Sequence, residues 1–137
     1  MSDAQSLAHE LDRVMRKLDA QMHKTMPKVD HARVGPMGSL LLMQLEAMQP
    51  CSIQALATAM GRDNSQLTRL LRDLESKGVL IRKTSEHDAR MTLLELTDKG
   101  GLFLADAKSV LTDAVDGVVE PLDTNEKSTL LALLRKI

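Results

Sequence analysis

Apolar residues recur along most of this chain at helical spacing and predict a mainly helical protein. Between Ala4 and about Lys24 they fall three or four positions apart, which places them on one face of a helix; they are Leu7, Leu11, Val14, Leu18 and Met22. Residues 26–35 contain Pro, Asp and Gly without periodicity, so we interpret them as a loop. A second helix follows over residues 36–48, and because it is apolar almost all round, we expect it at the centre of the fold.

Two helices joined by a tight turn are predicted in the middle of the chain. Ser52 is a suitable N-cap for a helix over residues 53–60, and Gly61 can adopt the positive φ angle that a sharp turn requires. The next helix covers residues 64–77. Residues that suit a close crossing stand at helix-turn-helix spacing; they are Ala57, Leu67 and Leu70. Any two packed helices with a glycine turn would fit equally well, so the spacing alone leaves both interpretations open.

After these helices the period changes to that of β-strands. Residues 79–83 and 91–96 are predicted as two strands, and the polar residues 84–90 between them as the turn of a β-hairpin. Helix, turn, helix and hairpin in this order form a winged helix-turn-helix, which presents its second helix to the major groove of DNA.

Two further helices complete the predicted order. Thr97 caps a helix over residues 98–119, and Asp123 with Glu126 forms a capping box at the start of the last helix. Together with the first helix, these segments carry more apolar surface than the interior of a 137-residue domain needs. We therefore expect them to form the interface of a homodimer.

Composition supports a helical core and locates the positive charge. The chain has no Trp or Tyr and one Phe, Phe103, so aliphatic and Met side chains must fill the core, which argues against an all-β sandwich. The formal net charge is −1, but residues 62–90 hold seven basic and five acidic side chains. A positive bias thus lies in the helix-turn-helix and hairpin, and the remainder is acidic.

Several classes of protein are excluded on the sequence. No apolar run is long enough to span a bilayer and the N-terminus does not resemble a signal peptide, so we expect a cytoplasmic protein. The single Cys51 excludes an intramolecular disulfide, and we interpret it as a small buried hydrophobic residue. The four histidines show no metal-ligand spacing, and no phosphate loop or nucleophile motif is present. We therefore expect no metal, no cofactor and no enzymatic activity.

The polar face of the second helix in the helix-turn-helix favours DNA binding over simple solvation. Its side chains are short or forked hydrogen-bonding groups, where a merely solvated face would more often carry Glu and Lys. Amides suit adenine, guanidinium groups suit guanine, and hydroxyls suit phosphates. The candidate DNA-binding residues on this helix are Asn64, Ser65, Gln66, Thr68, Arg69 and Arg72.

The predicted hairpin turn adds cations that could reach the DNA backbone or a minor groove. Besides Arg82, the candidate contacts are Lys83, His87 and Arg90. Asp88 and Arg90 could brace one another across the turn. The alternative is a charged hairpin tip that only keeps the protein in solution, although its position after a helix-turn-helix weighs against this.

Taken jointly, the motifs of residues 56–100 resemble those of the MarR family of bacterial regulators. They include L-A-x-x-L-G, a D-x-S-x-(V/L)-T-R helix start, L-E-x-x-G-(L/V)-(L/V)-x-R, D-x-R in the wing, and L-T-x-x-G. In this chain they occupy Leu56–Gly61, Asp63–Arg69, Leu74–Arg82, Asp88–Arg90 and Leu96–Gly100. The last residues are also family-like, so the resemblance extends over nearly the whole chain.

The resemblance implies a transcriptional regulator, expected to be a repressor, that binds pseudo-palindromic double-stranded DNA as a homodimer. Residues 1–137 would form a single domain, with residues 36–97 as the DNA-binding region and residues 1–35 and 98–137 as the dimerisation helices. Two recognition helices would then lie about one turn of DNA apart.

This chain departs from the family pattern at two positions and lacks the aromatic side chains expected around a bound aromatic ligand. Arg62 replaces the usual aliphatic residue after the turn glycine, and Gly38 is expected to leave room where helix two often has a bulky side chain. Related proteins often release DNA when a small aromatic acid or phenol binds. The residues that could line such a cleft here equally suit a plain core, which we favour; they are Met22, Met26, Met37, Leu41 and Met43.

The main alternative function is a winged helix reused for protein contacts without DNA binding. The acidic net charge favours this alternative slightly. The salt dependence of retention on DNA would separate the two, because phosphate neutralisation makes affinity fall steeply with salt.

Overall fold

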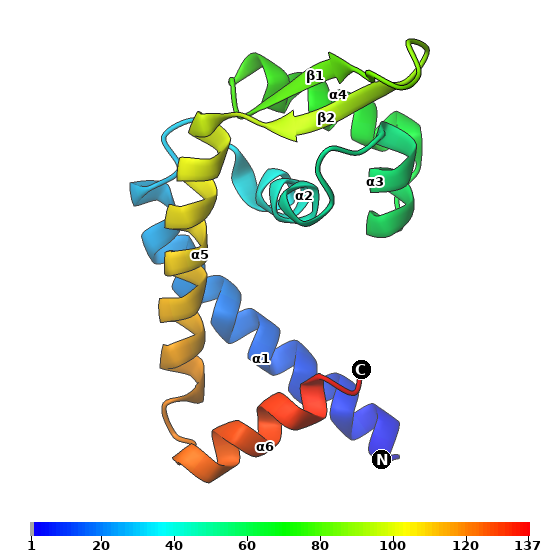
Figure 1. Ribbon diagram of the computed structural model, residues 1–137. Coiled ribbons are helices and arrows are strands. Elements are labelled where there is room, and N and C mark those ends of the chain that lie inside the picture. Colours follow the sequence, from blue (N-terminus) through cyan, green and yellow to red (C-terminus); the bar gives the residue numbers. More distant parts are fainter. Residues whose placement is uncertain (1) are drawn as a thin grey trace. The chain divides into compact units, whose positions relative to one another are not determined.

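A computed structural model describes residues 2–137 and shows a mainly helical chain with one small β-hairpin, as predicted (Figure 1). The elements in order are α1 (Asp3–Thr25), the 3₁₀ turn η1 (Met26–Lys28), α2 (Gly35–Met48), α3 (Ile53–Met60), α4 (Asn64–Ser76), β1 (Leu80–Thr84), β2 (Thr92–Leu96), α5 (Asp98–Val119) and α6 (Thr124–Leu134). Predicted and observed bounds of the helices and strands differ by at most one residue, except that α6 ends at Leu134, before the end of the chain. The predicted loop over residues 26–35 begins with the 3₁₀ turn η1.

Side-chain caps set the start of several of these helices. The side chain of Ser52 accepts a hydrogen bond from Ala55 N at the start of α3, and Asp63 does the same for Gln66 N at the start of α4. At α6, Asp123 and Glu126 form the predicted capping box. Each cap satisfies a backbone N–H that has no partner within its own helix, so the helix begins where the sequence places the cap.

The chain divides into two compact units. One comprises the N-terminal residues up to Met26 together with Ser109–Ile137, and the other comprises Pro27–Lys108. The boundaries differ from the predicted division at residues 36–97, because the loop before α2 and the first part of α5 belong to the second unit.

In the unit Pro27–Lys108, α2 lies at the centre of a leucine-rich core, as expected from its apolar sequence. It contacts α3 and β2, while α4 contacts α3 and β1 (Figure 1). Leucines from every one of these elements are completely buried; they are Leu41, Leu42 and Leu45 of α2, Leu56 of α3, Leu67, Leu71 and Leu74 of α4, Leu80 of β1 and Leu94 of β2.

The hairpin is attached to the helices along one face. Leu80 pairs with Leu96 and Lys83 with Leu93 in an antiparallel register. Cys51, between α2 and α3, adds a short bridge to β2, since its N–H donates to Leu94 O at 3.3 Å and its carbonyl accepts from Leu94 N at 2.7 Å. Burial raises the pKa of the Cys51 thiol, which agrees with its interpretation as a small buried hydrophobic residue.

Gly38 does not leave room, contrary to expectation. A Cβ atom at this position would lie 2.7 Å from Val34 Cγ1 and 3.1 Å from Leu74 Cδ2. The side chains of Val34, at the start of α2, and of Leu74 in α4 already occupy the space of the missing Cβ, so the glycine lets both pack against α2.

Gly100 allows a still closer approach. A Cβ atom there would lie 2.0 Å from the carbonyl oxygen of Val79, a residue that is itself completely buried. Beside it, Thr97 N donates to Val79 O at 3.2 Å and Thr97 Oγ1 donates to Gly78 O at 2.5 Å. The L-T-x-x-G run therefore joins the start of α5 to the backbone between α4 and β1, and the glycine makes that junction sterically feasible.

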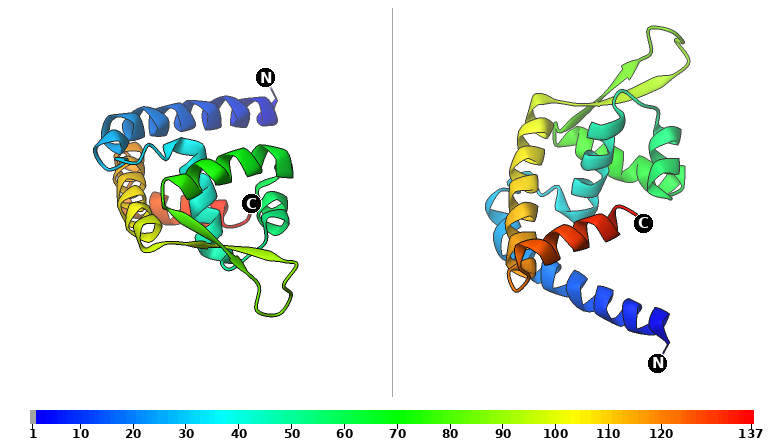
Figure 2. Two further views of the ribbon diagram at one scale, coloured as in Figure 1. Left: turned by 90° about the horizontal axis from the view of Figure 1, so that it is seen from above. Right: turned by 60° about the horizontal axis from the view of Figure 1, so that its bottom comes forward.

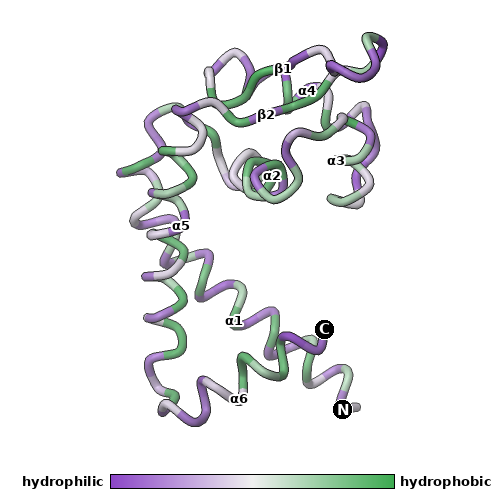
Figure 3. Tube along the Cα trace, viewed as in Figure 1, coloured by the Kyte–Doolittle hydropathy of each residue, from purple (hydrophilic) through white to green (hydrophobic). Residues whose placement is uncertain are grey.

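The other unit leaves much of its apolar surface in solvent. Among its described residues, neither α1 nor α6 has a buried side chain. Figure 3 shows apolar and polar positions alternating along both helices. The exposed apolar side chains include Leu7, Leu11 and Met15 of α1 and Leu131, Leu133 and Leu134 of α6.

No helix in the described part of the chain has the length and apolar character that crossing a membrane would require.

Candidate nucleic-acid interface

Helix α4 has one buried face and one polar face. Leu67, Leu71 and Leu74 recur at steps of four and three and are completely or almost completely buried. Ser65, Arg69 and Arg72 recur at the same steps and are exposed. With 3.6 residues per turn, the two sets lie on opposite sides of the helix. The leucines fix the rotation of α4 about its axis, so the serine and the two arginines face outward.

The two arginines on this face are available to a ligand. Within residues 2–137, neither Arg69 nor Arg72 forms an ion pair, whereas the nearby Lys77 pairs with Asp73 at 2.8 Å. An exposed guanidinium without a carboxylate partner retains all its donors for a phosphate or a guanine edge.

The other candidate residues of α4 differ in how far they are already engaged. Asn64 and Gln66 are exposed on the flanks of the polar face. Thr68 is half-buried and its hydroxyl donates to Asn64 O at 2.6 Å, while the Ser65 hydroxyl donates to Asp63 Oδ1 at 2.6 Å. Both hydroxyls donate their hydrogen to an oxygen of the protein, so in this conformation they can only accept hydrogen bonds from an external ligand.

Asp63 places a negative charge at the start of the helix. The hydrogen bonds from the Ser65 hydroxyl and from Gln66 N lower the pKa of this carboxyl, so it is ionised at neutral pH. The N-terminal backbone groups of α4 therefore already have an anionic partner. This leaves the arginines of the polar face as the groups of α4 that suit a phosphate.

The hairpin is less cationic than its sequence suggested. Arg82 Nε lies 2.6 Å from Glu75 Oε2 of α4, and Lys83 Nζ lies 2.8 Å from Glu95 Oε2 of β2. Glu75 thus links α4 to the hairpin. Neither carboxylate partner was predicted, because each pair joins residues whose proximity depends on the fold.

The turn of the hairpin keeps its own cation exposed. Arg90 Nε lies 3.6 Å from Asp88 Oδ1, and the Arg90 backbone N–H donates to the same oxygen at 3.0 Å. The Arg90 side chain is nevertheless 95% exposed, so the contact is loose. His87 is also exposed. Figure 2 shows the turn projecting beyond α3 and α4 in both views.

Ser85 organises this turn and was missed in the sequence. It is buried, its hydroxyl accepts from His87 N at 3.2 Å and from Asp88 N at 3.3 Å, and its own N–H donates to Met91 O at 2.9 Å. A serine hydroxyl that receives backbone N–H groups two and three residues on is a recognisable turn signal, so the sequence did contain a hint.

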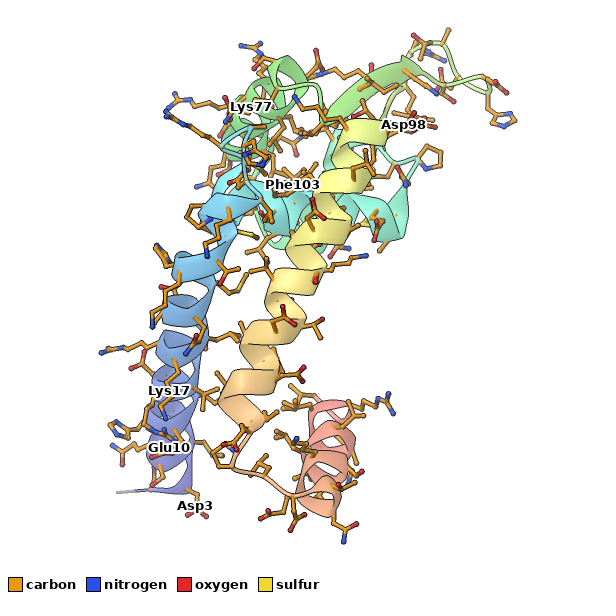
Figure 4. The ribbon with its side chains drawn as sticks, turned by 90° about the vertical axis from the view of Figure 1, so that its left-hand side faces the viewer. Asp3, Glu10, Lys17, Lys77, Asp98 and Phe103 are labelled. Carbon is orange, nitrogen blue, oxygen red and sulfur yellow. The ribbon has the colours of Figure 1, made fainter. Side chains whose placement is uncertain are left out.

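Lysine side chains brace the C-terminal end of α4. Lys77 Nζ donates to Arg33 O at 2.7 Å, and Lys99 Nζ donates to Lys77 O at 2.8 Å. Figure 4 labels Lys77 at this junction and Asp98 at the start of α5. The C-terminal end of α4 is therefore held by both the loop before α2 and the first turn of α5.

The five residues proposed to line a ligand cleft fall on both compact units, so the cleft stays a prediction. Leu41 is completely buried in the core, and Met43 is half-buried. Met37 is exposed, and its sulfur lies 3.7 Å from Nη2 of Arg62. Met22 and Met26 are half-buried in the other unit.

The part of the chain that the structure describes contains no group of three or more His, Cys, Asp or Glu side chains that could hold a metal ion.

Comparison with known protein families identifies relatives of this chain. Residues 39–92 match the model of the MarR family. The chain is 32% identical over 100 residues to the transcriptional repressor MprA of Escherichia coli. This alignment covers 72% of this chain and 57% of that protein. It is 34% identical over 87 residues to the HTH-type transcriptional regulator BilQ of Clostridium symbiosum. This alignment covers 64% of this chain and 60% of that protein. The chain thus spans less than two thirds of these relatives.

Solved structures of similar fold cover nearly all of the chain. The transcriptional repressor CouR bound to a 23-mer DNA duplex matches with a TM-score of 0.76 and 28% identity, over 95% of this chain and 90% of that one. A mutant MarR from Escherichia coli complexed with operator DNA matches with a TM-score of 0.77 and 23% identity, over 96% and 92% of the two chains. The second likeness supports the winged helix-turn-helix fold alone.

Proposed function

This chain belongs to the MarR family, and on that premise we propose that it is a homodimeric transcriptional repressor that binds specific sites in double-stranded DNA. The observation that carries the proposal is the outward face of α4, where Arg69 and Arg72 are exposed and form no ion pair within residues 2–137. A helix of this composition, held by leucines on its other side, suits the major groove.

We assign base contacts to the exposed side chains of α4 and backbone contacts mainly to the hairpin. Arginine suits guanine and the amides suit adenine, while Arg90 and His87 at the projecting turn suit phosphates or a minor groove. The complete set proposed to contact DNA is Asn64, Ser65, Gln66, Thr68, Arg69, Arg72, Lys83, His87 and Arg90. Asp88 would hold Arg90 in place before DNA is bound.

The unit containing α1 and α6 supports the homodimer. Leu7 is 63% exposed, Leu11 55% and Leu133 53% in the single chain. Apolar side chains repeated along two helices at such exposure favour association, because covering them removes apolar area from water. We therefore keep residues 1–35 and 98–137 as the dimerisation segments of a single domain and residues 36–97 as its DNA-binding region.

The relatives agree with this assignment. CouR was solved on a DNA duplex, and MprA and BilQ are named as a repressor and a transcriptional regulator. A repressor acts on the chromosome, so we place the protein in the cytoplasm, and we propose no enzymatic activity for it. Release from DNA by a small aromatic acid or phenol is a further proposal, which rests on the family alone.

Binding to the DNA next to the protein's own gene tests the proposed function. Fluorescence anisotropy with a labelled duplex of that intergenic region should show saturable binding that weakens steeply between 50 and 200 mM salt, and a scrambled duplex should bind more weakly. Equal weak binding to all duplexes, or none at low salt, would contradict the proposal and favour a winged helix used for protein contacts. Repeating the titration with phenols and aromatic acids tests effector release.

A further inference from the structure

One acidic side chain holds a cation that the hairpin would otherwise offer to DNA. In the register of the hairpin, Lys83 is opposite Leu93 and Glu95 is opposite Ile81. Because side chains alternate between the two faces of a strand and paired residues share a face, all four lie on the same face. Lys83 and Glu95 are diagonal neighbours there, which accounts for the 2.8 Å between Lys83 Nζ and Glu95 Oε2.

This pair lies on the open face of the hairpin. The opposite face carries Leu80 and Leu94, which are completely buried against the helices. The side chains of Lys83 and Glu95 are 55% and 30% exposed. Water therefore reaches both charges, and an exposed ion pair of this kind adds little to stability. A phosphate of bound DNA can therefore take the place of the carboxylate beside Lys83.

The second ion pair of the hairpin differs in position and in what it connects. Arg82 lies on the face that packs against the helices and pairs with Glu75 of α4, at 2.6 Å. That pair joins two elements and serves the fold. The Lys83–Glu95 pair joins two adjacent strands that are already paired along their whole length from Leu80–Leu96 to Thr84–Thr92, so this pair adds no new link between elements.

The charge of the hairpin depends on Glu95. Residues 80–96 hold three basic side chains and three acidic ones, so their formal charge is zero with neutral His87. Lys83 is the penultimate residue of β1, next to the projecting turn. If its ammonium group meets a phosphate, the Glu95 carboxylate is within reach of the same phosphate and repels it.

We infer that Glu95 is a restraint on DNA affinity: it neutralises Lys83 in the free protein and opposes the phosphate contact that Lys83 would make. The inference rests on the proposed function and adds a positioning residue to the DNA-binding surface. A lysine that neutralises a phosphate releases counterions, and this release makes affinity depend on salt. Removing the charge of Glu95 should therefore add one phosphate contact for each wing on the DNA.

The test compares Glu95→Gln, Lys83→Gln and the double variant in the anisotropy titration, with the intergenic duplex as probe. Glu95→Gln should bind more tightly at 50 mM salt. The plot of log affinity against log salt should steepen by about 0.9 for each wing on the DNA. The affinity advantage of Glu95→Gln over the unmodified protein should therefore shrink about threefold per wing between 50 and 200 mM salt. When Lys83 is already replaced, Glu95→Gln should give no further gain, so the double variant should match Lys83→Gln.

Glu86→Gln is the matched control, because Glu86 lies in the same hairpin and forms no ion pair among the described residues. An equal gain in Glu86→Gln would show that net charge alone matters and would overturn the inference. So would an unchanged affinity and salt slope in Glu95→Gln, or a gain that survives in the double variant. Should the unmodified protein bind no duplex, the proposed function fails first, so the two failures are distinguishable.

Discussion

Replacing Gly100 by alanine should destabilise the protein, although alanine is the better helix former. The new Cβ would lie 2.0 Å from Val79 O. Real contacts of this kind are rarely closer than 3.0 Å, so the backbone of α5 and the carbonyl must separate by about 1 Å. A backbone carbonyl in a completely buried residue cannot rotate away as a flexible side chain could.

The expected magnitude follows from three contributions. Overpacking of this kind costs about 1–3 kcal/mol. The same movement strains the hydrogen bonds of Thr97 to Val79 O and Gly78 O, at about 1 kcal/mol for each bond lost. Higher helix propensity returns about 1 kcal/mol. With both hydrogen bonds lost, the net loss in the free energy of unfolding is then about 2–4 kcal/mol, or about 7–14 °C in Tm for a chain of this size.

Gly101→Ala is the matched control, one position further along α5. No described atom lies within 4 Å of the Cβ that this substitution adds, so only the gain in helix propensity of about 0.5–1 kcal/mol remains. Urea unfolding followed by circular dichroism, with all proteins at one concentration, gives both values. Loss of stability in both variants, or in neither, would refute the close approach of α5 to Val79.

Three further predictions concern the interface, the dimer and pH. Arg69→Ala should weaken binding to the intergenic duplex by about 1–3 kcal/mol without lowering Tm, whereas Arg135→Ala, at the C-cap of α6, should leave Kd unchanged; equal values for both would remove Arg69 from the interface. Leu11→Asp should weaken dimerisation at least about tenfold in sedimentation equilibrium, and Ala20→Asp, half a helical rotation away, should not; a stable dimer in both would exclude the α1 stripe. Because hydrogen bonds lower the pKa of Asp63 in the folded state, its ionised form stabilises the protein above the ordinary pKa of 3.8, and this contribution is lost as pH falls through the lowered value. The stability advantage over Asp63→Asn in urea unfolding should therefore be present at pH 7 and decrease as the pH is lowered below 3.8, and an advantage independent of pH would contradict this assignment.

Much of the local structure could be predicted because its causes are close together in the sequence. Ser52, Asp63 and Asp123 each cap a helix through a residue only three positions away. The left-handed conformation of Gly61, with φ at 64°, likewise needs no distant partner. The same holds for the polar face of α4, since helical geometry alone separates its arginines from its leucines.

The candidate site was predicted in its inventory but not in its electrostatics. Lys83 and Arg82 both counted as free cations from the sequence, yet each has a carboxylate partner twelve or seven positions away. Which strand faces carry them, and which carboxylates they meet, depends on the register of the hairpin and on its packing against α4. An ion pair between distant residues leaves no periodic trace in a sequence.

The chain's order of residues settles where each helix and strand begins and ends and which side of it is apolar, because caps, turns and side-chain period act over a few positions. It does not settle how closely two segments approach. No local pattern marks Gly38 or Gly100, but the side chains of Val34 and Leu74 occupy the Cβ space at Gly38, and the Val79 carbonyl occupies it at Gly100. Such distances arise when separate segments pack together, and the final charge of the proposed DNA-binding surface arises in the same way.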